Sequence, residues 1–239
     1  NQTSFLIERR IRRDGSNFDL NPFSKNDDEL IGLNTNFRNS LFFNRGKQYH
    51  STTYSFLINE SQNLINVQFD GNQNLASLES ISAKNQSHQL QYQHLVKKSW
   101  LFNFSGSTTS TESTSENYPN RNFEIESYQV EPKIGYLFSK NASWDIFYEF
   151  QQKENQIGAF ETLKQTRLGT SFTFNSEKGF SMNGEFSMYN NSYEGNALSA
   201  VGFQMLEGLQ PGKNQTWRLL LQKNLTQYLD VNINYQGRN

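Results

Sequence analysis

The residue types that most often carry chemistry are sparse in this chain and poorly spaced for it. There are three histidines, His50, His88 and His94, and no cysteine. His88 and His94 are six residues apart, which separates them by about 20 Å along an extended strand. They cannot share a metal ion at that distance, so we interpret the histidines as isolated strand residues. The absence of cysteine excludes disulfides and thiolate metal sites.

Motifs with a known chemical role are also missing. The acidic run Asp27-Asp28-Glu29 offers oxygen ligands for a calcium ion, with a solvated loop as the alternative interpretation. The sequence contains no GxGxxG, P-loop, HExxH, GxSxG or EF-hand pattern. Serine and asparagine are so abundant that no Ser/His/Asn arrangement stands out. We therefore expect no catalytic, cofactor-binding or metal-binding residues, no cofactor and no enzymatic activity.

Composition narrows the fold class more than the function. The chain has 239 residues and a net charge of -1, so it lacks the basic surface of a nucleic-acid-binding protein. Only 34% of its residues are apolar, and the mean hydropathy is -0.78, yet 14% are aromatic. A disordered chain of this polarity would lack the aromatic residues. Single apolar residues in a polar background are what alternating β-strands require.

Alternation of apolar and polar residues predicts an all-β fold. In the segment 229–236, Leu, Val, Ile and Tyr alternate with Asp, Asn, Asn and Gln, which gives one apolar and one polar face. The same period of two recurs at 144–151, and 196–209 is the one short helix candidate. The sequence predicts about thirteen antiparallel strands, near 2–13, 30–43, 48–58, 64–69, 75–83, 87–96, 100–106, 123–138, 144–152, 166–174, 180–188, 216–222 and 228–236.

The connections between these strands alternate in length. Short ones, rich in Gly, Asn and Ser, suit tight hairpins and fall at 44–47, 70–74, 97–99, 139–143, 175–179 and 223–227. The other set contains the long connections, with shorter members at 59–63 and 83–87, and falls at 14–29, 107–122, 153–165 and 189–215. We name the end with the short turns side A and the other end side B. This sorting by length is typical of an outer-membrane β-barrel, whose short turns are periplasmic and whose long loops are extracellular.

Aromatic residues gather beside the side-A turns. Five of them begin the strand that follows such a turn: Tyr49, Trp100, Trp144, Phe180 and Tyr228. A ring of aromatic side chains at one level is typical of the membrane–water interface of a barrel. We therefore predict that these five residues lie at the lipid interface, although aromatic residues favour strands in general.

The first strand carries a basic cluster. Arg9 shares strand parity with Phe5, Ile7 and Arg13, so both arginines lie on its apolar side near side B. There they are expected to contact the phosphates of outer-leaflet lipid, which guanidinium groups bind well. A soluble linker is the alternative for this segment.

The strand count suggests an incomplete barrel. The first predicted strand rises from side A and the thirteenth also ends on side B, whereas bacterial single-chain barrels have an even number of strands. We therefore expect residues 1–239 to form one β-barrel domain that lacks at least one strand after Asn239, and a barrel with further strands before Asn1 is left open as an alternative.

The C-terminal third resembles a known class of proteins. The stretches at 202–212, 214–218 and 232–238 are similar to the C-terminal regions of large outer-membrane or cell-surface β-barrel proteins of the Bacteroidetes. The resemblance implies a location in the bacterial outer membrane but no activity and no functional residues.

The alternating strands and the sorted connections are compatible with two classes of function. In the first, the chain is an integral outer-membrane β-barrel with a structural, transport or partner-anchoring role. Its partners would be outer-membrane lipid and other outer-membrane proteins or lipoproteins, and it would bind no nucleic acid. In the second, it is a secreted cell-surface adhesin or glycan-binding β-protein that buries its apolar face inward.

Overall fold

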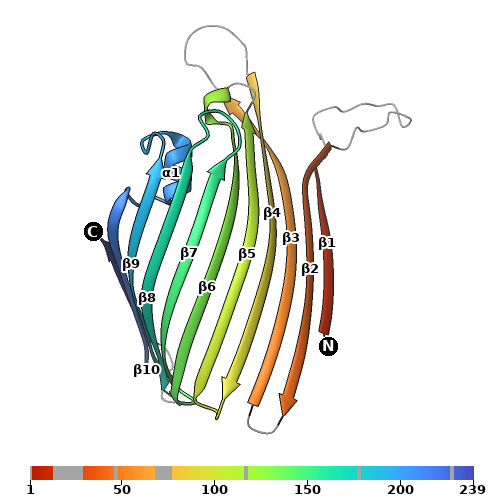
Figure 1. The fold of residues 1–239 in the computed structure, drawn as a ribbon. Coiled ribbons are helices and arrows are strands. Elements are labelled where there is room, and N and C mark those ends of the chain that lie inside the picture. Colours follow the sequence, from red (N-terminus) through yellow and green to blue (C-terminus); the bar gives the residue numbers. More distant parts are fainter. Residues whose placement is uncertain are drawn as a thin grey trace.

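The computed structural model describes residues 2–12, 29–45, 48–67, 77–115, 118–176, 179–226 and 229–239. They form one antiparallel sheet of eleven strands, which confirms the all-β prediction (Figure 1). The strands are β1 (Gln2–Arg12), β2 (Glu29–Arg45), β3 (Gln48–Val67), β4 (Ser77–Val96), β5 (Trp100–Ser115), β6 (Phe123–Ser139), β7 (Ala142–Asn155), β8 (Thr162–Ser176), β9 (Phe180–Glu194), β10 (Gly212–Thr226) and β11 (Leu229–Arg238).

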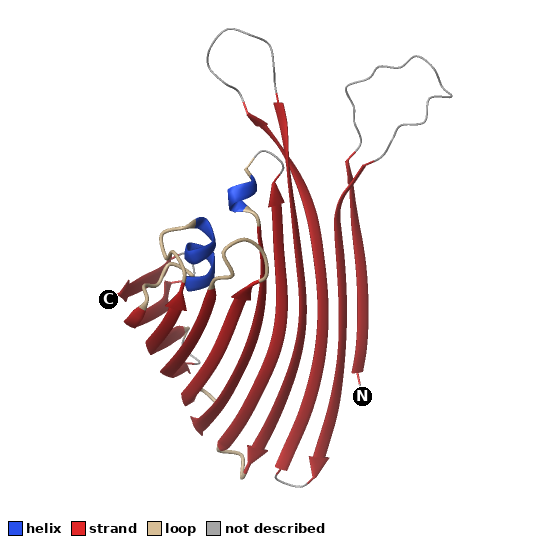
Figure 2. Ribbon diagram, turned by 45° about the horizontal axis from the view of Figure 1, so that its top comes forward, coloured by secondary structure: helices blue, strands red, loops and turns tan. Residues whose placement is uncertain are grey.

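The sheet is a curved meander. Each strand pairs with its neighbours in the sequence, so the order across the sheet is the order along the chain. In the part of the chain that the structure describes, β1 and β11 are the two edges and do not pair with each other (Figure 2). The sheet therefore has the curvature of a barrel wall without being closed.

Two short helices lie at side B. The 3₁₀ helix η1 (Pro119–Arg121) precedes β6, and α1 (Ala200–Leu206) lies between β9 and β10, inside the predicted helical segment 196–209. The Ser199 hydroxyl caps α1 by accepting a hydrogen bond from the Gly202 backbone N–H at 2.9 Å. None of the described helices is long and apolar enough to cross a membrane.

The prediction of thirteen strands was wrong because β3 and β4 are twice as long as expected. The predicted connections at 59–63 and 83–87 lie inside these strands, where Asn59 pairs with Asn85 and Ser61 with Ala83. Glu60 and Lys84 also pair there, and their side chains are 3.1 Å apart. The hydrogen bonds between paired strands are made by backbone groups. Polar side chains therefore do not interrupt the pairing where they contact water or a polar partner.

Other connections also differ from their predicted positions. β5 continues to Ser115, so most of the predicted loop 107–122 is a strand. The predicted side-A turn at 70–74 lies outside the described residues, but it joins the ends of β3 and β4 at Val67 and Ser77, which belong to side B. The side-A turns between β4 and β5 and between β6 and β7 are found as predicted.

Pairing register gives the sheet two chemically different faces. Directly paired residues point to the same side, so each face can be followed from strand to strand. One face, which we call the apolar face, carries large exposed side chains such as Phe102, Ile134, Ile146, Leu168 and Ile233. The opposite face, the polar face, carries Glu149, Gln165, Ser187 and Asn191, all of them buried.

Side chains are crowded on the polar face around the paired residues Phe147 and Gly169. A Cβ atom at Gly169 would collide with the Phe147 ring and lie 2.8 Å from the Ser187 hydroxyl oxygen. Crowding of this kind is expected on the inner side of a curved sheet. The Phe147 ring therefore fills the space that Gly169 leaves open.

We expect Gly169→Ala to lower the free energy of unfolding by about 1–3 kcal/mol, because a well-packed aromatic ring would have to move. Urea unfolding measures the change. Gly106→Ala is the matched control, since the nearest atom to its Cβ position is 3.9 Å away. It should be neutral or stabilise the chain by up to about 1 kcal/mol. Equal losses at the two glycines would contradict the packing argument.

Candidate functional site

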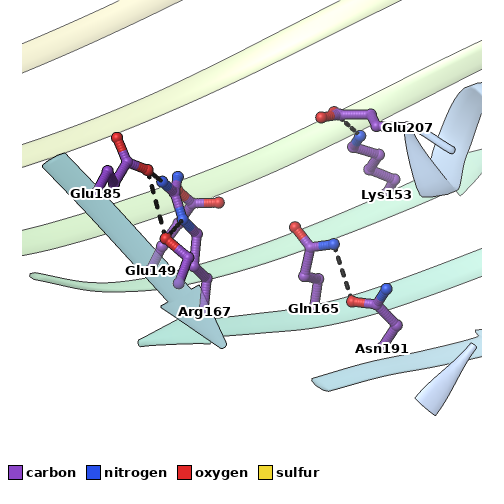
Figure 3. A network of polar contacts seen from close by, with 8 residues as sticks. Glu149, Lys153, Gln165, Arg167, Glu185, Asn191 and Glu207 are labelled. Atoms are coloured by element: carbon purple, nitrogen blue, oxygen red, sulfur yellow. Dashed lines mark hydrogen bonds and ion pairs between the residues drawn. The ribbon is translucent and has the colours of Figure 1, made fainter. Parts of the chain in front are cut away.

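The most elaborate side-chain arrangement of the described chain is an ionic cluster on the polar face, centred on Arg167 of β8 (Figure 3). Its guanidinium donates to the carboxylates of Glu149 on β7 and Glu185 on β9, and Nε donates to the Ser187 hydroxyl at 3.1 Å. The Nη1–Glu149 Oε2 distance is 3.2 Å. The Arg167 guanidinium also lies 4.6 Å from the Phe147 ring centroid. The cluster thus ties three neighbouring strands together.

Burial makes this cluster different from a surface ion pair. Glu149 is only 6% exposed, and the Arg167 side chain is 20% exposed. A charge that is removed from water is tolerated only when it is paired and hydrogen-bonded, as both groups are here. The cluster therefore fixes the alignment of β7, β8 and β9 on the polar face.

A second polar contact holds α1 against the sheet. The Lys153 ammonium donates to the Met205 carbonyl at 3.0 Å and to the Glu207 carboxylate, at the C-terminal end of α1. Cations are favoured at this end of a helix, where carbonyl groups have no helical partner. Apolar packing supports the same position through the buried cluster Ile125, Leu163, Val201, Met205 and Leu206. The helix is thus a fixed part of the polar face.

Amide side chains continue the network towards α1. Gln165 donates to Asn191 at 2.9 Å, and the Asn191 amide donates to the Gln210 carbonyl at 3.0 Å. Asn214 donates to the same carbonyl at 2.7 Å. These contacts anchor the segment that leads from α1 back into β10.

The carboxylates on the polar face of the described residues are possible metal ligands. Within the described residues, no three His, Asp or Glu side chains come close enough together to hold a metal ion. The carboxylates of Glu149 and Glu185 are both engaged by Arg167. The arrangement is suited to holding the side chains of the polar face in fixed positions.

The apolar face forms an exposed belt on β6 to β9. On β6, every residue of this face from Tyr128 to Phe138 is apolar or aromatic, and Tyr128, Val130, Ile134 and Phe138 are 40–58% exposed. On β7 the belt runs from Trp144 to Phe150, and on β8 and β9 it includes Leu168, Phe186 and Met188.

Towards side B the same face becomes charged at one level across the sheet. Glu112 pairs directly with Glu124, and Glu126 pairs directly with Glu154. Like charges directly opposite each other are unfavourable, and water lowers that cost. On β6 the belt therefore ends abruptly, where Glu126 follows Tyr128 on this face.

Three of the five predicted interface aromatics lie together at the side-A end of the apolar face. Trp100, Trp144 and Phe180 are on this face, and the Trp100 and Tyr136 rings are 4.9 Å apart. Tyr49 was misplaced: it pairs with Asn44 and Leu95 on the polar face, and its ring contacts Phe42. The strand begins at Gln48 as predicted, so it is the pairing register that places the Tyr49 side chain on this face. Tyr228 lies outside the described residues.

The predicted lipid-phosphate contacts are only partly located. Arg9 lies in β1 and pairs with Leu33 of β2, while Arg13 lies outside the described residues. Asp27 and Asp28 are also outside them, and Glu29 begins β2.

Two of the histidines form a pair that the sequence did not predict. His88 and His94 are far apart on β4 as expected, but His94 pairs with His50 of β3, and their ring centroids are 4.0 Å apart. His50 Nδ1 is 2.9 Å from the Tyr92 hydroxyl. Which residues of two strands lie side by side depends on the pairing register of those strands. The pair could therefore be predicted only if β3 and β4 were already known to form a hairpin in this register. The Arg167 cluster was missed for the same reason, since its members are 18 residues apart in sequence.

Neither protein-family models nor curated protein sequences gave a match to this chain.

Proposed function

We propose that this chain forms part of the wall of an integral β-barrel in a bacterial outer membrane. The observation that carries the proposal is the contrast between its two faces. Large apolar side chains are exposed on one face, whereas on the other the Glu149 carboxylate is buried and its partner Arg167 is only 20% exposed. A soluble sheet has the opposite arrangement, because water favours buried apolar and exposed charged groups.

The dimensions of the belt support this proposal. The β6 residues from Tyr128 to Phe138 cover about 33 Å along the strand at roughly 3.3 Å per residue. With the strand tilted by about 40°, this corresponds to about 25 Å of height, which is the apolar band of a transmembrane barrel. Trp100, Tyr136 and Trp144 at one margin and the glutamates at the other supply the two interfaces.

Within this proposal, the polar face lines a hydrated interior. The Arg167 cluster and α1 occupy that interior and would narrow it on the side-B half. The role of the barrel would be structural, transport of a solute, or anchoring of other outer-membrane proteins or lipoproteins. A secreted surface adhesin is the competing function, and it predicts a different location.

Cell fractionation distinguishes the two functions. The full-length protein is expected in the outer-membrane fraction, resistant to high salt and alkaline carbonate, and released by detergent. A known periplasmic protein and a known barrel serve as the controls for each wash. Recovery of the folded protein in the culture medium, or its release by carbonate alone, would reject the barrel and favour the adhesin.

We also expect side B to face the outside of the cell. Protease added to intact cells should cut the connections 156–161 and 195–199, while the β6–β7 turn at Lys140 and Asn141 should be spared until the outer membrane is opened. Mass spectrometry of the fragments identifies the cut sites. The segment 107–115 is a strand and should also resist cleavage. Cleavage restricted to the side-A turn would show that the orientation is inverted.

A further inference from the structure

A polar cavity of about 610 Å³ opens on the polar face between β8 and β11. Its main polar lining residues are Arg167, Glu185, Tyr189, Arg218, Gln236 and Arg238. The register explains why there is space. Ser187 pairs with Thr216, so two small side chains lie at the level between the Glu185–Arg218 pair and Tyr189. A volume of this size falls within the range of small-molecule sites.

The three guanidinium groups of the lining differ in how they are used. Arg167 is engaged by Glu149, Glu185 and Ser187. Arg238 donates to the Gly208 carbonyl at 2.7 Å. Arg218, which lies opposite both Glu185 and Gln236, makes no hydrogen bond or ion pair within the described part of the chain. The lining thus holds three positive groups against one carboxylate, with the donors of Arg218 still available.

We propose that this cavity binds a small solute that carries an oxyanion, either a carboxylate or a phosphate, with Arg218 as its principal ligand. A guanidinium presents paired N–H donors that match the two oxygens of such a group. The Gln236 amide, the Thr216 hydroxyl and the Tyr189 hydroxyl surround Arg218 and donate to hydroxyl groups of the same solute. A neutral analogue would leave the positive charge of the lining uncompensated. The site therefore prefers a negatively charged solute to a neutral one.

The position of the cavity favours a solute from the aqueous phase over a membrane lipid. It is on the polar face, opposite the exposed belt, so a lipid on the apolar face cannot reach it. The inference goes beyond the proposed membrane function, because it requires only the folded sheet. It holds equally for a barrel and for a secreted protein.

Titration calorimetry on the purified full-length chain tests the proposal, in detergent or in buffer as its solubility requires. The three probes are glucuronate, inorganic phosphate and glucose. At least one of the two anions should bind at least about tenfold more tightly than glucose, and its affinity should fall as salt is added. Binding of glucuronate alone assigns a carboxylate solute, and binding of phosphate alone assigns a phosphate solute.

Substitution of Arg218 supplies the second readout. Arg218→Gln should weaken anion binding by about 10- to 100-fold without changing the unfolding midpoint, because Arg218 has no partner in the described part of the chain. Arg218→Lys should recover part of the affinity, because it keeps the charge and loses the paired donors. Arg121→Gln is the matched control, since Arg121 stacks on Tyr118 far from the cavity.

The proposal is overturned if the folded wild-type chain binds neither anion, if glucose binds equally well, or if Arg218→Gln leaves the affinity unchanged. None of these results bears on the membrane location, which cell fractionation decides separately.

Discussion

Replacing Arg167 with alanine is expected to lower the free energy of unfolding by about 3–5 kcal/mol. Arg167 is the common partner of Glu149 and Glu185, and its removal leaves the Glu149 carboxylate buried with its charge uncompensated. Breaking a buried pair by deleting one partner costs this much because the remaining charge has lost both water and its counterion. Urea unfolding of the detergent-solubilised or soluble chain measures the loss.

Two variants separate this effect from a general loss of charge. Lys84→Ala breaks an ion pair with Glu60 whose side chains are 47% and 41% exposed, so it should cost no more than about 1 kcal/mol. The double variant Arg167→Met with Glu149→Leu should recover much of the stability, because the buried carboxylate is removed and the remaining Glu185 side chain is 35% exposed. A loss at Arg167 no larger than the loss at Lys84 would show that the cluster is effectively solvated.

Replacing Ile146 with arginine should cost about 2–4 kcal/mol when the protein is folded in a lipid bilayer. Ile146 lies in the middle of the apolar belt on β7, between Ile134 and Thr170, and is 47% exposed. An arginine at that depth would place its charge in hydrocarbon. In a soluble protein, the same substitution at so exposed a position would change stability by only about 0.5 kcal/mol. The size of the loss in stability therefore shows whether the apolar face is surrounded by lipid or by water.

Asn190→Arg is the matched control on the same face. Asn190 is exposed and lies on β9 beyond Met188, where the belt gives way to polar residues. An arginine at an interface costs about 0–1 kcal/mol. Refolding into lipid vesicles, followed by denaturant titration, compares the two variants. Similar small losses at Ile146 and Asn190 would place the apolar face in water or against a partner.

The sequence predicted the strands whose two faces differ most in polarity. In β7, Trp144, Ile146 and Tyr148 alternate with Asp145 and Glu149, and the structure confirms this strand and both of its faces. In β11, Val231 and Ile233 share the apolar face and Asn232 lies on the polar one, as the alternation indicated. Alternation succeeds here because the period of a strand is fixed by its backbone.

Prediction failed where both faces of a strand are polar. Around Asn59 and Asn85 the alternation disappears, and only the backbone ladder shows that β3 and β4 continue. Turn chemistry and strand chemistry look alike in such a segment, because asparagine and serine serve both. Tyr49 shows a second limit: its strand begins at Gln48 as predicted, but only the pairing with Asn44 and Leu95 reveals that its side chain lies on the polar face.

The candidate sites could not be predicted at all from local sequence. Arg167, Glu149 and Glu185 each look like ordinary polar residues of a strand, and Arg218 looks like any exposed arginine. Their relationships depend on the register of three hairpins at once. A sequence read strand by strand does not contain that register.

The meander order of the sheet has a consequence for how the chain assembles. Every strand finds its partners among its immediate neighbours in sequence, so each pairing closes only a short loop. Contacts of this kind form quickly, and the wall can grow by adding one hairpin at a time. A growing edge that slipped by one residue would turn its apolar side chains towards the buried charges of the polar face. The Glu149–Arg167–Glu185 cluster forms only when three successive strands are added in the correct alignment. It would therefore stabilise the correct register relative to a slipped one.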